Sequence, residues 1–288
     1  MPSTIAPALW TGMFHPLGLP LKTTIAELSQ AGFAVAELCG PYLMALSQEA
    51  DCEDCACDLR SHCDSLGFWL TQAHGPALSF ASPDAEARVQ ACQEVERLLP
   101  ILHILGIRTL VFHADNQAEP HRDSWTKCWQ NCLGRNADAF RRLVGQATDF
   151  GIRIAVENVI DGKGPGRRVF GAHPMDLEAL LEQVPGLGLN LDTAHARAMN
   201  LDIPALIHQF GERLYGLHIS DSTGVFHDLH LTPGKGDLDW VAIICALCDV
   251  GYDGDFHMEL PHERADGLTE TRAAAREAYE VCQRLLVE

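Results

Sequence analysis

The amino-acid sequence predicts a single-domain (β/α)8 barrel, the TIM-barrel fold, spanning residues 1–288. Short apolar runs alternate eight times with helical patterns along the chain, and α/β barrels of roughly 250 residues commonly form one domain. No proline- or serine-rich linker and no block of like charge interrupts this alternation. An open doubly wound sheet is the alternative fold. Because no Gly-x-Gly-x-x-Gly follows the first apolar run, a dinucleotide-binding sheet has little support.

The expected strands are short and apolar, as strands buried on both faces should be. They cover residues 5–10, 34–39, 68–73, 109–112, 153–156, 187–191, 214–219 and 255–260. The expected helices cover residues 24–31, 55–66, 84–105, 124–150, 174–183, 204–210, 238–249 and 269–286. Several helices end with a glycine before the next strand, for example Gly32, Gly106 and Gly151. A glycine in this place fits a left-handed residue that closes the helix.

Composition and charge narrow the classes of partner. The hydrophobic share of 47% is enough for a sizeable core, and the net charge of −18 repels polyanions, which disfavours nucleic acid as a partner. The first residues lack the basic and apolar segments of a signal peptide, and no apolar run approaches the ~20 residues that span a bilayer. We therefore expect a cytoplasmic protein without a membrane segment, with its 11 cysteines as reduced thiols. A homo-oligomer is left open.

Metal-capable side chains gather where the apolar runs end. Glu157 follows the run 154–156, Asp192 follows the run 189–191, and Glu259 lies inside the last run. Burying an unpaired carboxylate is very costly, so such residues need a cation, a partner or a proton. Because the active site of a barrel forms at the carboxyl ends of its strands, we expect one shared site. The full set is His74, His113, Glu157, Asp192, His195, His218, Asp228, His230 and Glu259.

The ligand types of this set indicate a hard or borderline divalent metal. Carboxylate and imidazole groups without cysteine suit Mn²⁺, Mg²⁺, Co²⁺, Fe²⁺ or Zn²⁺. An isolated histidine on a strand is more often a hydrogen-bonded core residue than a ligand. A structural ion-pair network is the competing interpretation of the whole set, but few Lys or Arg residues lie at these strand ends to pair the carboxylates.

Four segments carry a resemblance to a known family. They are Ile154-Ala155-Val156-Glu157-Asn158, Leu191-Asp192-Thr193-Ala194-His195, Leu217-His218-Ile219-Ser220-Asp221 and Pro233-Gly234-Lys235-Gly236-Asp237-Leu238-Asp239-Trp240. With these motifs the chain resembles the xylose isomerase-like TIM barrel superfamily, which holds sugar isomerases and epimerases, inosose dehydratases and the endonuclease IV type of AP endonuclease. The resemblance runs from about Ile5 to Leu286, and its second half is the specific part.

In the epimerase branch, the resemblance implies one divalent ion bound by Glu157, Asp192, His218 and Glu259. It also implies that Glu157 and Glu259 are catalytic: they exchange protons with a sugar carbon from opposite faces, through a metal-stabilised enediolate. This sequence departs from the family in two places. No Lys in a strand matches the catalytic Lys of xylose isomerase itself, and residues 219–224 lack the Arg that the epimerase branch places after this His. The identity of the sugar or related polyol carbonyl compound is therefore left open.

In the endonuclease branch, the resemblance implies a three-zinc site, whose extra ligands match His74, His113, His195, Asp228 and His230. Three clustered cations suit the hydrolysis of a phosphodiester. The acidic balance of the chain argues against DNA, since a duplex reader needs a basic footprint. The leading hypothesis is a sugar isomerase or epimerase that uses one to three divalent ions. A multinuclear zinc hydrolase and an inosose-dehydratase-like lyase are the alternatives.

Other side chains are candidates for binding the substrate. A glycine-rich loop after Glu157 holds the cations Lys163, Arg167 and Arg168, and either covers the pocket as a lid for an anionic group or is a merely solvated loop. His195 is expected to contact the substrate or a second metal. Phe14 and Trp10 are expected either to pack against a sugar's apolar face or to pack in the core. The cysteines between Cys52 and Cys63 fall at helical spacing, which favours packing over a metal cluster.

Overall fold

Eight parallel strands form a nearly closed barrel in the computed structural model, which describes residues 5–115, 125–162, 168–261 and 267–287. The strands follow one another in the order β7-β6-β5-β4-β3-β2-β1-β8. The ring closes between β7 and β8 at Ile219, whose N–H donates to His257 O at 2.7 Å and whose carbonyl accepts from Glu259 N at 3.1 Å. The strand bounds are β1 Pro7–Trp10, β2 Val35–Leu38, β3 Trp69–His74, β4 Thr109–His113, β5 Arg153–Glu157, β6 Gly188–Asp192, β7 Leu214–His218 and β8 Phe256–Met258.

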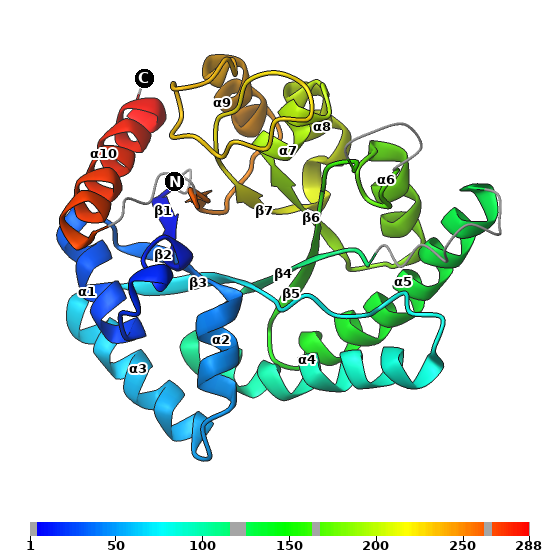
Figure 1. Ribbon diagram of the computed structural model, residues 1–288, viewed down its shortest axis with the longest axis horizontal. Helices are drawn as coiled ribbons and strands as arrows, with labels where there is room; N and C mark the ends of the chain where they lie inside the picture. The colour runs from blue at the N-terminus through cyan, green and yellow to red at the C-terminus, as the bar shows by residue number, and fades with distance from the viewer. Residues whose placement is uncertain (1–4, 116–124, 163–167, 262–266, 288) are drawn as a thin grey trace.

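The helices surround the strands as an outer ring (Figure 1). They are α1 Leu21–Ala31, α2 Gly40–Ser47, α3 Cys52–Leu66, α4 Ala85–Leu105, α5 Trp125–Thr148, α6 Pro174–Gln183, α7 Thr193–Ala198, α8 Ile203–Phe210, α9 Trp240–Asp249 and α10 Leu268–Val287, with 3-10 turns η1 Thr11–Met13, η2 His15–Leu17 and η3 Gly211–Arg213. The predicted fold is confirmed, with many element bounds shifted by a few residues. The short helices α2 and α7 were not predicted.

Three of the differences from the predicted elements occur where strands end. α7 forms because the side chain of Asp192, the last residue of β6, accepts a hydrogen bond from His195 N at 2.7 Å and so caps the helix. α2 begins directly after β2 with Gly40 and Pro41, and proline is well suited to the first turn of a helix. β8 is shorter than predicted and ends at Met258, so Glu259 follows this strand instead of lying within it.

The interior of the barrel carries a polar layer, where barrels commonly hold branched apolar side chains. Gln72 on β3 donates through Nε2 to Glu37 Oε2 on β2 at 3.1 Å and to Asn190 Oδ1 on β6 at 3.2 Å. All three side chains are buried. Gly216 on β7 leaves room for this layer, because a Cβ there would lie 2.4 Å from Gln72 Oε1 and 2.5 Å from Asn190 Oδ1.

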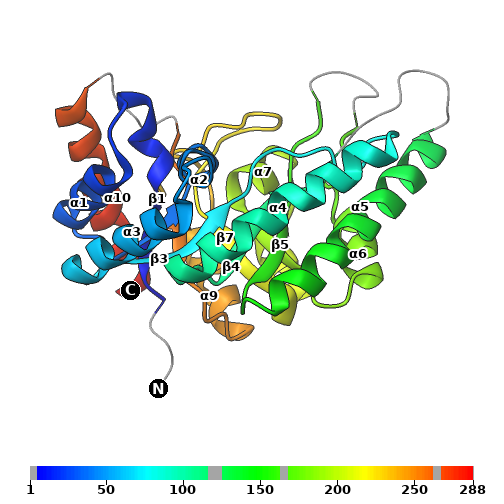
Figure 2. The same cartoon turned by 90° about the horizontal axis from the view of Figure 1, so that it is seen from below.

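Large apolar side chains pack outside the barrel wall, between the strands and the helices. Phe80 lies with its ring centroid 5.3 Å from Phe112 on β4 and 5.3 Å from Phe140 on α5. Figure 2 shows the loop that follows β7 at one end of the barrel and the start of β1 toward the other. Among the residues that the structure describes, no helix is long and apolar enough to cross a membrane.

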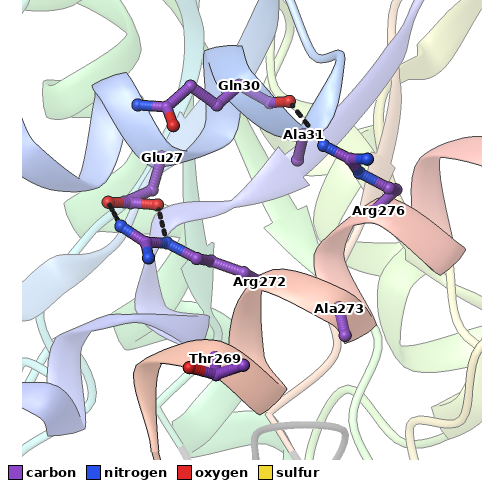
Figure 3. A pocket seen from close by; sticks show the side chains of 7 residues that line it. All are labelled: Glu27, Gln30, Ala31, Thr269, Arg272, Ala273 and Arg276. Carbon is purple, nitrogen blue, oxygen red and sulfur yellow. Dashed lines mark hydrogen bonds and ion pairs between the residues drawn. The ribbon is translucent and has the colours of Figure 1, made fainter.

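The first and last helices of the ring, α1 and α10, meet at a seam of ion pairs and hydrogen bonds (Figure 3). Arg272 on α10 donates two hydrogen bonds to the buried carboxylate of Glu27 on α1. Arg276, one turn further along α10, donates to Gln30 O at 3.5 Å. A cavity of about 310 Å³ lies between these side chains. Two side chains of α10 in its lining bond to α1, so this seam connects the first and last helices of the outer ring.

Candidate metal centre

The carboxyl ends of the strands bring the nine candidate ligands to one mouth of the barrel. The last residues of β3 to β7 are, in order, His74, His113, Glu157, Asp192 and His218, and Glu259 follows β8. Because parallel strands end at the same edge, these side chains meet. His195 joins them from the first turn of α7, and Asp228 and His230 come from the loop after β7.

Candidate ligands form three groups, each with ligand atoms that lie within 4.8 Å of one another. The first cluster is Glu157, Asp192, His218 and Glu259; the second is His74, His113 and Glu157; the third is Asp192, His195 and His230. Glu157 is shared by the first and second clusters, and Asp192 by the first and third. The clusters are therefore continuous, and each offers the oxygen and nitrogen ligands that divalent cations take.

In the first cluster, two carboxylates converge on one imidazole nitrogen. His218 Nδ1 lies 2.9 Å from Glu157 Oε1 and 3.3 Å from Glu259 Oε2. Asp192 is fully buried, and its Oδ2 has no hydrogen-bond partner among the described residues. A buried carboxylate oxygen without a partner is costly, so this atom indicates a cation that the protein would hold there. The residues present thus fit a divalent metal ion.

In the second cluster, both histidines turn Nε2 toward Glu157. His74 Nε2 lies 3.3 Å and His113 Nε2 3.1 Å from Glu157 Oε2. The other ring nitrogen of His74 lies 2.8 Å from Gly75 O. Since a carbonyl oxygen can accept but not donate, His74 Nδ1 carries a hydrogen, and in the neutral ring Nε2 is left with its lone pair. This is the arrangement that a metal-binding histidine needs.

The histidines of the third cluster repeat this arrangement toward Asp228, a predicted ligand that belongs to none of the three groups. His195 Nδ1 lies 2.8 Å from Asn158 O and His230 Nδ1 lies 3.1 Å from Glu259 O, so both rings donate through Nδ1 to backbone carbonyls. Their Nε2 atoms lie 3.6 Å and 2.8 Å from Asp228 Oδ1. His230 has a φ of 45°, a left-handed backbone conformation that is uncommon for residues other than glycine and costs free energy. The loop accepts this strain where it presents His230 to the cluster.

The clusters shift one another's protonation. Burial opposes a charged imidazole, but nearby carboxylates outweigh it and raise the pKa of His74 to about 9 and that of His195 to about 10. Burial also opposes ionisation of Glu157, yet the positive charge of neighbouring imidazoles holds its pKa well below the usual range. For Glu259, burial is the largest influence, and the pKa is raised. Without metal, the protons held by His74 and His195 therefore offset part of the negative charge of the surrounding carboxylates.

A hollow of about 450 Å³ opens beside the first and second clusters. Its lining includes the ligand candidates His74 and Glu259 together with Trp10, Met44 and Pro76. The Trp10 ring lies against Gly12, where a Cβ would come within 2.2 Å of it. Trp10 Nε1 is buried and has no hydrogen-bond partner within the described parts of the chain. The hollow thus joins charged groups to an apolar, aromatic wall.

The remaining predicted substrate contacts lie elsewhere or outside the described residues. Phe14 is fully buried in the apolar core, and therefore offers no surface to a substrate. Arg168 donates to the buried carboxylate of Asp176 on α6 at 2.8 Å. Lys163 and Arg167 fall outside the described residues. The cysteines of α3 belong to none of the three groups found in the described chain.

Glu37 on β2 is the buried site residue that the sequence analysis missed. Its carboxylate oxygens lie 3.1 and 2.9 Å from His218 Nε2. Burial opposes its ionisation, but the positive charge of His218 lowers the pKa of Glu37 below the usual range. The available signal was the one that identified Glu157: a carboxylate inside a short apolar run, here Val35-Ala36-Glu37-Leu38.

Comparison with known proteins places the chain in a family. The profile of the xylose isomerase-like TIM barrel family matches residues 25–285, so the chain belongs to this family. Its relatives include a D-psicose 3-epimerase from Enterocloster bolteae, 26% identical over 255 residues that cover 83% of this chain and 76% of that protein. A ketose 3-epimerase from Arthrobacter globiformis is 25% identical over 85% of this chain and 78% of its own length.

Two further similarities concern part of the chain and the fold. An uncharacterised protein from Methanocaldococcus jannaschii is 26% identical over 139 residues, which cover 47% of this chain and 46% of that protein. The crystal structure of a D-psicose 3-epimerase in the presence of D-fructose superposes with a TM-score of 0.81 at 16% identity, covering 99% of this chain and 100% of that one. At this level of identity, the structural similarity demonstrates a shared fold.

Proposed function

We propose that this protein is a divalent-metal-dependent epimerase or isomerase of a sugar or a related polyhydroxylated carbonyl compound. The observation that carries the proposal is the approach of Glu157 and Glu259 to the same nitrogen, His218 Nδ1, from β5 and from the end of β8. With Asp192 they complete one four-residue ligand set. Two relatives that each span more than four fifths of this chain are named as 3-epimerases of D-psicose and of ketoses, which supports this class of reaction.

The residues of the first cluster suit a proton transfer at carbon. When bound, a divalent cation would supply Lewis acidity to the substrate oxygens and so lower the pKa of the adjacent C–H group. One of Glu157 and Glu259 would take that proton, and the other would return a proton to the opposite face of the same carbon or to its neighbour. The hollow lined by Trp10, Met44 and Pro76 would hold the apolar face of the sugar beside Glu259.

A second candidate function rests on a separate observation. The second cluster shares Glu157 with the first, and the third shares Asp192 with it, so the three candidate ligand groups are adjacent at one mouth and would hold up to three cations side by side. Such an arrangement suits a multinuclear zinc hydrolase, because neighbouring ions can generate hydroxide and hold a leaving oxygen. The net charge of −18 disfavours a nucleic acid as its substrate.

Hydrogen exchange at the substrate carbon tests the first proposal. The protein, loaded with Mn²⁺, Co²⁺ or Mg²⁺, is incubated in D2O with a panel of ketohexoses and ketopentoses, free and phosphorylated. NMR then follows deuterium incorporation next to the carbonyl together with the appearance of an epimer or isomer. We expect both signals with the metal-loaded protein, and neither after chelation. Cleavage of a phosphodiester by the zinc-loaded protein, with no exchange in any sugar, would replace the first candidate by the second.

A further inference from the structure

A fully buried carboxylate outside the candidate ligand set holds the far side of the His218 ring. Glu37 lies on β2 and His218 at the end of β7, strands that are not neighbours in the barrel, yet His218 Nε2 lies 2.9 Å from Glu37 Oε2. The opposite ring nitrogen, Nδ1, faces Glu157 and Glu259. Both ring nitrogens thus face carboxylates, but Glu157 and Glu259 belong to the candidate ligand set and Glu37 does not. A neutral imidazole has one N–H and one lone pair, so a metal bound at Nδ1 would leave the N–H on Nε2, where Glu37 accepts it.

We infer that Glu37 is a positioning residue: it accepts the Nε2–H of His218 and thereby presents the Nδ1 lone pair to the metal position of the first cluster. This inference rests on the proposed function, because it takes the first cluster to be a metal site. Histidines that bind metals in proteins depend on such a partner, which fixes both the tautomer and the ring orientation and raises the basicity of the ligating nitrogen.

The polar layer of the barrel interior holds Glu37 in this place. Gln72 donates to Glu37 Oε2 at 3.1 Å and is itself anchored across the barrel by Asn190 Oδ1 at 3.2 Å. Gly216, beside them, leaves no space for a side chain of its own, since even a Cβ would collide with Gln72 and Asn190. Burying a charge and two amides in a barrel is costly. The hydrogen bonds of Gln72 with Asn190 and Glu37, and of Glu37 with His218, offset this cost.

Two roles for Glu37 give different outcomes. If Glu37 merely neutralises a buried charge or fills space, metal affinity should follow folding stability in every variant of this layer. If Glu37 sets the ring of His218, metal affinity should depend on the acceptor at position 37 more strongly than on stability. Substitutions at positions 37 and 72 separate these cases, because Gln72 is in the same buried layer but bonds Glu37 and Asn190.

The test compares Glu37→Met, Glu37→Gln and the matched control Gln72→Met in the full chain. Affinity for Co²⁺ is measured by competition with a chelator, stability by urea unfolding, and the state of the His218 ring by ¹⁵N NMR of the Zn²⁺-loaded protein. We expect Glu37→Met to weaken first-cluster binding about 10–100-fold. Glu37→Gln, which keeps a carbonyl acceptor, should lose less. Gln72→Met removes one hydrogen bond to Glu37 but keeps the carboxylate that accepts from His218, so it should lose the least affinity, even where it is as destabilised as the variants at position 37. The wild-type ring should show hydrogen on Nε2.

Several results would overturn the inference: equal affinity in Glu37→Met and the wild type, an equal loss in Gln72→Met, or a wild-type ring with hydrogen on Nδ1. If Glu37→Met does not fold, the comparison of Glu37→Gln with Gln72→Met decides. The inference then requires that Glu37→Gln binds Co²⁺ more weakly than Gln72→Met. A wild-type protein that binds metal as expected but exchanges no sugar hydrogen would refute the proposed function and leave the role of Glu37 supported. A wild-type protein that binds no divalent ion would overturn both.

Discussion

Glu157 uses both carboxylate oxygens, Oε1 toward His218 in the first cluster and Oε2 toward His74 and His113 in the second. We expect Glu157→Gln to lower turnover by about 10²–10⁴-fold, the usual contribution of a general acid or base, and to weaken metal binding in both clusters. Glu259→Gln should lower turnover similarly but weaken the first cluster alone. Kinetics together with metal stoichiometry check this. The exposed Glu178→Gln on α6 is the control, and a Glu157→Gln or Glu259→Gln protein that turns over normally with metal bound would contradict the two-carboxylate mechanism.

Single residues at strand ends could be predicted from the sequence where the chain marks the end of a strand. Glu157, Asp192 and His218 each follow or close an apolar run, and parallel strands bring such ends together whatever the details of packing. The position of Phe14 could not be derived in this way. It lies between two 3-10 turns that carry no periodic signal, and tertiary packing turned its ring into the core.

At the scale of elements, the loop between β7 and α9 is organised by one buried carboxylate. Asp221 accepts hydrogen bonds from Ser222 N and Leu238 N through Oδ1, and from Gly234 N and Trp240 Nε1 through Oδ2, at 2.8 to 3.2 Å. This loop carries Asp228 and His230. A carboxylate that receives four donors fixes the loop from both ends, because breaking one bond leaves a buried donor unsatisfied.

We therefore expect Asp221→Ala to lower the free energy of unfolding by about 2 kcal/mol or more, because several buried donors lose their acceptor. Metal should be lost from the third cluster while the first cluster still binds. Urea unfolding and metal stoichiometry measure the two effects. Asp237→Ala in the same loop is a matched control, since the Asp237 side chain is about half exposed and its ion pair with Arg197 contributes little. Full occupancy of the third cluster in Asp221→Ala would refute this role.

The seam between α1 and α10 gives a second prediction at this scale. Arg272→Met should lower the free energy of unfolding, because it leaves the buried carboxylate of Glu27 without its partner; the half-exposed guanidinium limits the loss through solvent screening. Arg276→Met is the matched control, since Arg276 reaches Gln30 O at 3.5 Å. Chemical unfolding gives the cost, and metal affinity should be the same in all three proteins. A stability loss in Arg276→Met as large as that in Arg272→Met would contradict this assignment.

Helices with a repeating apolar pattern and a residue that marks their start or end could be predicted from the sequence. Helices whose formation depends on a single tertiary contact could not. α6 was predicted at its observed bounds because Pro174 marks its first turn and apolar residues recur along it. α7, by contrast, is six residues long and depends on the cap that Asp192 gives to His195 N. The same Asp192 reads in the sequence as a ligand at a strand end. That Asp192 also caps α7 follows from the relative position of β6 and α7, which the sequence pattern does not give.

At the scale of the whole molecule, the alternation of apolar runs and helices over the full chain indicated the fold class, since a closed parallel barrel surrounded by helices buries both faces of eight such strands. The polar layer inside the barrel was not predictable in the same way. Glu37, Gln72 and Asn190 come from three distant strands, and each alone reads as a polar interruption of an apolar run. Their common position depends on strand register and on the missing side chain of Gly216.

Without metal, the stability of the whole protein should fall as the pH rises, while the stabilisation that a bound metal adds should grow. Burial opposes the charged rings, but surrounding carboxylates raise the pKa of His74 and His230 to about 9 and that of His195 to about 10, against 6.5 for an unperturbed histidine. Protons held more tightly in the folded state stabilise it. For the metal-free protein, this contribution is fully present below about pH 6.5 and is lost as the pH rises through 9 to 10. Metal binding needs neutral rings, so it releases protons and strengthens over the same window.

We therefore expect the unfolding temperature of the metal-free protein to fall between pH 7 and pH 10, while the increase produced by a saturating divalent ion grows. Thermal unfolding at a series of pH values, with a chelator or with metal, measures both curves, and calorimetry in buffers of different ionisation enthalpy counts the protons released. His208→Gln, which alters a histidine on the exposed face of α8, should leave both curves in place. Metal-free stability that stays constant over this range would show that the histidines are neutral in the folded protein, because neutral rings hold no protons that could be lost as the pH rises above the pKa of the unfolded chain.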